Sequence, residues 1–97
     1  MSEPPGDERI HGAARLFRAM GEPGRLAVLA ALLGEDHTVS ELAAAVGAPV
    51  SQVSHRLRLL EADGLIRKRR DGRHTWVALA DDHVRRIVAD GLAHGDE

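Results

Sequence analysis

The sequence of 97 residues contains no cysteine. A chain without cysteine can form no disulfide, no thiolate metal site and no thiol switch, and it suits a reducing cytosol. No apolar run approaches the roughly 18 residues that a bilayer requires. Residues 1–7 are polar and contain prolines, unlike a basic and apolar signal peptide. We therefore expect a cytoplasmic protein with no membrane association.

Features of an enzyme are also scarce. The sequence shows no evident pair of nucleophile and base and no glycine-rich phosphate loop, so we expect no catalysis. Hydrophobic residues make up 43% of the chain. This composition suits a single small domain over residues 1–97, whose marginal core would gain stability from an oligomeric partner.

The formal net charge of −2 hides an uneven distribution. Residues 51–76 contain seven basic side chains and three acids, a balance of +4. Residues 77–97 contain two arginines and five acids, a balance of −3. A basic block is typical of a nucleic-acid surface, and an acidic tail suits cations. The simpler alternative is a solvated charged face.

Apolar side chains recur at helical spacing in five stretches, which predicts five helices. Capping signals support the boundaries, including Pro23 at a first helical position and a Thr38-x-x-Glu41 capping box. The expected helices are residues 7–20, residues 23–34, a short helix between Thr38 and Gly47, residues 50–63, and residues 81–95.

After Gly64 the spacing of apolar residues changes from helical to the alternation of extended strands. Leu65–Arg70 and His74–Leu79 flank the dipeptide Asp71-Gly72, which predicts a β-hairpin over residues 65–79. A helix-turn-helix followed by such a ribbon is a winged helix-turn-helix. The expected fold is mainly α with a small β-hairpin (α+β), in the order α-α-α-α-β-β-α, and homodimeric through its first and last helices.

The helix over residues 50–63 is the expected reading helix, because its polar side chains point away from the apolar stripe and could meet base edges and phosphates. Long cations on the wing could reach phosphates beside the groove. The predicted contacts to double-stranded operator DNA are Ser51, Gln52, Ser54, His55, Arg56, Arg58, Lys68, Arg70, Arg73 and His74.

The last helix carries two pairs of metal-ligand residue types, Asp81 with His83 and His94 with Glu97. Eleven residues turn a helix by ~1,100° and advance it by ~16 Å, so the two histidines share a face but cannot hold one ion in one protomer. Two such helices packed antiparallel about a two-fold axis would form two identical four-ligand sites. The spacing therefore predicts a metal and a dimer together.

Four segments carry a resemblance to a known family: MGEPGRL at 20–26, VSELA at 39–43, SQVSHRLRLL at 51–60 and DGR at 71–73. In this order and spacing the chain resembles the ArsR/SmtB metal-sensing repressors over nearly its whole length. In that family, sensors with a site on the last helix use an Asp-x-His pair and a His-x-x-Glu or His-x-x-His pair. The resemblance implies a homodimeric repressor that binds operator DNA when metal-free and releases it when metal binds.

The absence of cysteine makes arsenic, cadmium and lead improbable inducers. Two imidazoles and two carboxylates favour zinc, Zn(II), while nickel or cobalt, Ni(II) or Co(II), could gain further ligands from His11 or the terminal carboxylate. Gly91 and Gly95 weaken the last helix, so its final turn is expected to fray without metal.

Three alternatives remain open from the sequence. A winged-helix regulator without metal control would use the last helix only for dimerisation. An antitoxin-like or constitutive repressor would need no inducer. A metal-assisted hydrolase is the least favoured alternative, because the predicted site fills its positions with protein ligands.

Overall fold

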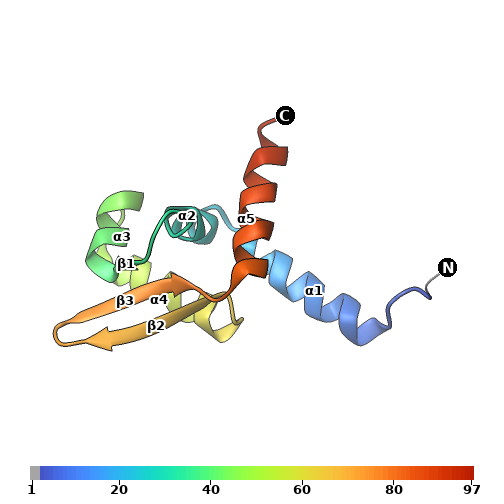
Figure 1. Ribbon diagram of the computed structural model, residues 1–97, viewed down its shortest axis with the longest axis horizontal. Helices are drawn as coiled ribbons and strands as arrows, with labels where there is room; N and C mark the ends of the chain where they lie inside the picture. Colours follow the sequence, from blue (N-terminus) through green and yellow to red (C-terminus); the bar gives the residue numbers. More distant parts are fainter. Residues whose placement is uncertain (1–2) are drawn as a thin grey trace.

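The computed structural model describes residues 3–97, and it contains five helices and a small antiparallel sheet that lies at one edge of the molecule (Figure 1). The elements follow in the order α1 (Asp7–Met20), α2 (Pro23–Ala31), β1 (His37–Thr38), α3 (Val39–Val46), α4 (Val50–Ala62), β2 (Ile66–Asp71), β3 (His74–Leu79) and α5 (Asp82–Gly95). The winged helix-turn-helix prediction is confirmed. Among residues 3–97 no helix is long and apolar enough to cross a membrane.

The sheet has a third strand that the sequence reading missed. β1 pairs with β3 in the register His37↔Val77 and Thr38↔Trp76, so the strand order is β1-β3-β2. A strand of two residues is too short to show alternating hydrophobicity, which explains why only a hairpin was expected. The element order is therefore α-α-β-α-α-β-β-α.

Two predicted boundaries were wrong by a few residues. α2 ends at Ala31 rather than Gly34, because the amides of Leu32 and Leu33 bond to carbonyls three residues back and tighten the last turn. The hairpin turn lies one residue later than expected: Asp71 pairs with His74, and only Gly72 in the turn has positive φ, at 61°.

Helix caps fix both ends of α3, the first helix of the helix-turn-helix motif. The Thr38 hydroxyl accepts from the Glu41 amide and the Glu41 carboxylate accepts from the Thr38 amide, as the sequence predicted. α3 then ends at Gly47, whose φ of 67° is left-handed and turns the chain toward α4.

The core lies between α2, α3 and α4, the inner face of the sheet, and one face of α5. Fully buried aliphatic side chains fill it: Val28, Leu29, Leu32, Leu42, Val53, Leu57, Leu60 and Val77 are all 0% exposed. α5 contributes Val84 and Val88 and stands beside α2, while α1 extends away from the motif (Figure 1). Much of α1 is therefore left exposed.

Candidate nucleic-acid interface and metal half-sites

The polar face of α4 is open to solvent. Pro49 occupies the N-cap position without a side-chain hydrogen bond. Ser51, Gln52, His55 and Arg58 are exposed, and Ser54 is half-buried. Nη2 of Arg58 lies 3.5 Å from Nδ1 of His55. Except for Ser54, this set of short hydrogen-bonding groups stands clear of the core.

Arg56 is engaged within the chain. Its guanidinium lies over Gly24 at the start of α2, where a Cβ would come within 2.8 Å of it. Its Nη2 also donates to Oε1 of Gln52 at 3.3 Å. Arg56 therefore links α4 to α2, a tertiary contact that no sequence pattern indicated.

The predicted wing cations divide between two environments. Arg70, Arg73 and His74 are exposed near the tip, and Nη1 of Arg70 donates to the Thr75 hydroxyl at 3.2 Å. Lys68 instead pairs with Glu61 of α4, with Nζ 3.4 Å from Oε1, and its side chain is 25% exposed. The free cations of this set thus gather at the wing tip.

Each end of α5 holds one histidine next to one carboxylate. Nδ1 of His83 lies 3.8 Å from Oδ1 of Asp81, and Nδ1 of His94 lies 3.5 Å from Oε2 of Glu97. The histidine side chains are 83% and 85% exposed. We call Asp81 with His83, and His94 with Glu97, the two half-sites. Within residues 3–97 no three His, Asp or Glu side chains converge in a way that could hold an ion.

Two features of α5 bear on the half-sites. Asp81 caps the helix, because its Oδ1 accepts from the Val84 amide at 3.0 Å, so one candidate ligand also has a structural role. The last turn is helical to Gly95, and the Glu97 amide bonds to the His94 carbonyl at 3.1 Å. His94 therefore lies in the last helical turn and Glu97 lies just beyond the end of α5. Fraying of this turn without metal stays a prediction.

Arg85 was not singled out by the sequence, yet it joins α5 to the end of α2. Its guanidinium donates to the carbonyl of Leu33, 52 residues earlier in the chain. No sequence signal could have shown this contact, because it depends on how α5 packs beside α2.

Two glutamates in the helix-turn-helix region are stabilised in their charged form. The pKa of Glu22 is lowered because its carboxylate accepts from the amides of Gly24 and Arg25 at the start of α2. The pKa of Glu41 is lowered by the Thr38 amide and then by His37, whose Nδ1 lies 3.1 Å away. His37 thus contacts the carboxylate that completes the capping box of α3.

An apolar hollow of about 510 Å³ lies between α1 and α5. Phe17, Met20, Leu26, Ile87 and Val88 supply its apolar lining. Phe17 is 58% exposed, a large fraction for an aromatic side chain. The two helices therefore present one shared apolar surface to solvent.

A three-helix motif with an exposed polar helix and a basic wing defines a winged helix-turn-helix protein of the DNA-binding class. Residues 22–68 match the model of the bacterial regulatory proteins of the arsR family. The chain is 41% identical over 86 residues to the transcriptional repressor SmtB homolog of Synechocystis, covering 86% of this chain and 65% of that protein. It is 37% identical over 94 residues to the transcriptional repressor SmtB of Mycobacterium tuberculosis, covering 97% and 70%. The chain belongs to the arsR family.

A solved structure agrees with this placement. The homodimeric winged helix-turn-helix DNA-binding domain of a possible ArsR-family regulator from Mycobacterium bovis superposes with a TM-score of 0.85 and 26% identity, covering 100% of this chain and 92% of that one. The two SmtB relatives are transcriptional repressors, which agrees with the expectation that the chain is not an enzyme.

Proposed function

We propose that this protein is a homodimeric transcriptional repressor whose release from operator DNA is controlled by a divalent metal ion. The observation that carries the proposal is the pair of exposed half-sites at opposite ends of α5. Each half-site offers one imidazole and one carboxylate, which are suitable donors for zinc, with nickel or cobalt as alternatives. Neither half-site alone supplies the four ligands of a closed zinc site.

Duplex DNA is the proposed partner of α4 and the wing. Ser51, Gln52, His55 and Arg58 would face base edges and phosphates in a major groove, and Arg73 would reach the flanking backbone. Arg56 and Lys68 stay in the proposed contact set, but their contacts to Gln52 and Glu61 lead us to expect smaller contributions from them.

The dimer would form through α1 and α5. The apolar hollow between these helices, together with exposed Ile10, Phe17 and Leu92, is a surface that an identical chain could cover. The homodimeric state of the Mycobacterium bovis relative supports this assembly. Antiparallel α5 helices would bring the Asp81–His83 half-site of one protomer to the His94–Glu97 half-site of the other, giving two sites per dimer.

Control of DNA binding would follow from the position of the half-sites across the dimer interface. Joining the half-sites would fix the angle between protomers and thus the separation of the two α4 helices. A separation that no longer matches successive major grooves weakens operator binding. A hundredfold weakening needs a coupling free energy of about 3 kcal/mol per dimer.

Calorimetry that counts zinc ions per dimer tests the shared sites directly. We expect two ions for the wild type and a loss of binding in His83→Ala and in His94→Ala. His55→Ala is the matched control, because His55 is also an exposed helical histidine but lies on α4. A count of zero in the wild type would remove the metal proposal.

Fluorescence anisotropy with labelled operator DNA then tests control. We expect zinc to release wild-type protein and to leave His94→Ala bound. If the metal-free dimer binds operator and neither zinc, nickel nor cobalt changes its affinity, the chain is a winged-helix regulator without metal control.

A further inference from the structure

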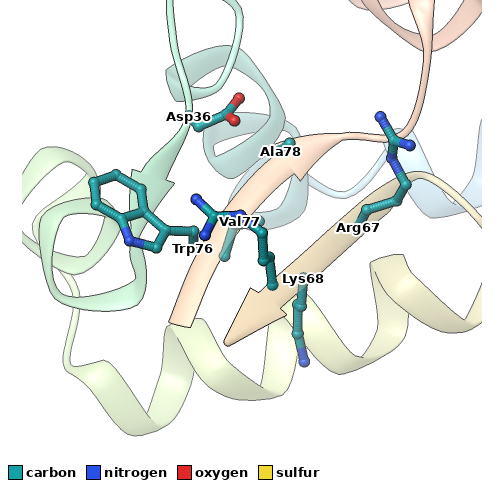
Figure 2. Close-up of a pocket in the computed structure, with 7 residues that line it drawn as sticks. Asp36, Arg67, Lys68, Trp76, Val77 and Ala78 are labelled. Atoms are coloured by element: carbon teal, nitrogen blue, oxygen red, sulfur yellow. The ribbon is translucent and has the colours of Figure 1, made fainter. Parts of the chain in front are cut away.

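The outer face of the sheet carries a polar hollow, and Lys68 is the one proposed DNA contact among its lining residues. Its volume is about 350 Å³, and β2, β3 and Asp36 line it. Figure 2 shows Ala78 in the middle of this hollow, with Trp76 and Asp36 to one side and Arg67 on the other. We refer to it as the outer hollow.

Strand register explains why these side chains meet. Arg67 is paired with Ala78 and Arg69 with Trp76 on neighbouring antiparallel strands, so all four project from one face. Because side chains alternate along a strand, the intervening Lys68 turns toward α4, where it pairs with Glu61. Because the Ala78 side chain is small, it leaves space at the base of the outer hollow.

The charged groups around this base are largely free. In the part of the chain that the structure describes, neither Arg67 nor Asp36 takes part in an ion pair, and both are exposed. Arg69 lies 3.6 Å from Asp71 in a loose contact, with its side chain 66% exposed. Trp76 is half-buried, so it is anchored and still presents part of its ring.

The chemistry of these groups specifies a class of ligand. Guanidinium groups bind carboxylates and phosphates through paired hydrogen bonds. An anchored indole offers a surface for stacking an aromatic ring. A carboxylate on the far side, here that of Asp36, accepts from an N–H group. The volume lies at the small end of the roughly 300–1,000 Å³ range of small-molecule sites.

We propose that the outer hollow binds a small planar organic anion. The ring of the ligand stacks on Trp76, its phosphate or carboxylate lies between Arg67 and Arg69, and an N–H edge faces Asp36. Purine nucleoside monophosphates and amino-substituted aromatic carboxylates share this chemistry.

Trp76 is the only tryptophan of the chain, so its fluorescence reports on the outer hollow. We would titrate the metal-free, DNA-free protein with guanosine monophosphate, exciting at the red edge of tryptophan absorption, and with para-aminobenzoate by calorimetry. Inorganic phosphate is the third probe. We expect saturable binding of at least one ring-bearing anion and no comparable binding of phosphate. Which of the two anions binds will distinguish a nucleoside monophosphate from an aromatic carboxylate as the ligand.

Three variants distinguish binding in the outer hollow from nonspecific attraction of an anion to positive charge. Arg67→Ala and Arg69→Ala should each weaken binding about tenfold or more, because each removes a charge-assisted contact. Arg70→Ala is the matched control: it removes the same charge from the same strand, but Arg70 bonds to Thr75 on the opposite face. Its affinity for the ring-bearing anion should stay within about twofold of wild type.

Several outcomes would overturn the proposal. They are a linear response without saturation, equal binding of phosphate and the ring-bearing anions, or an equal loss in Arg70→Ala. A change in Trp76 fluorescence on adding random-sequence duplex DNA, without saturable binding of either small anion, would instead assign this face to the nucleic-acid surface.

Discussion

Replacing Phe17 by glutamate should dissociate the proposed dimer. Phe17 lies on α1, borders the apolar hollow against α5, and is 58% exposed in the single chain. In the proposed assembly a second protomer covers this ring. A glutamate there would remove the apolar contact and would place two carboxylates near the dimer axis.

The size of the effect follows from the exposed area. A phenylalanine buries about 200 Å² when fully covered, so 58% exposure leaves about 115 Å² for a partner. At about 25 cal/mol per Å² this contributes up to about 3 kcal/mol per side chain. Two-fold symmetry doubles the contribution to about 6 kcal/mol, or roughly ten-thousandfold in the dimer dissociation constant.

Sedimentation velocity across a concentration series measures that constant. We expect wild type to be a dimer at micromolar concentration and Phe17→Glu to be a monomer. Val50→Glu is the control, because Val50 is 49% exposed on α4, away from α1 and α5. A dimeric Phe17→Glu, or a monomeric Val50→Glu, would show that the dimer surface is placed wrongly.

Three further predictions concern stability and DNA binding. Thr38→Ala removes the α3 cap and should lower the free energy of unfolding in urea by about 1 kcal/mol, whereas Thr38→Ser should restore most of it. The pKa of Glu22 is lowered mainly by the Gly24 amide, so the Glu22 carboxylate stabilises the fold above the ordinary glutamate pKa. This contribution is lost as the pH falls through the folded-state pKa. Glu22→Gln should therefore flatten the acid side of a plot of thermal midpoint against pH. Arg73→Ala should reduce the salt dependence of DNA binding by about one counterion, and Lys68→Ala by less, as measured by anisotropy at several salt concentrations.

Local signals predicted most of the fold. The end of α1 and the start of α3 follow from neighbouring residues, namely Gly21 after α1 and the Thr38–Glu41 capping box. β1 was missed because two residues show no period, and its strand character depends on pairing with β3. The early end of α2 was missed because no stop residue marks it; it follows from the bonds of the Leu32 and Leu33 amides to carbonyls three residues back.

The candidate sites divide in the same way. Each half-site on α5 joins residues two or three apart, so spacing alone could indicate it. The ion pair of Lys68 with Glu61 and the contact of Arg56 with Gly24 arise from tertiary packing, and no pattern in the sequence encodes them. The outer hollow was missed for the same reason, because it requires the register between β2 and β3.

α5 is physically connected to the DNA-binding motif, which bears on how a change at the dimer axis could reach DNA. Val84 and Val88 are buried in the same core that α4 enters through Leu57, and Arg85 bonds to the carbonyl of Leu33 after α2. A close-packed core resists relative sliding of its helices. A rotation of α5 would therefore carry α2 and α4 with it as one body, so the angle between two α5 helices in a dimer would set the separation of the two α4 helices.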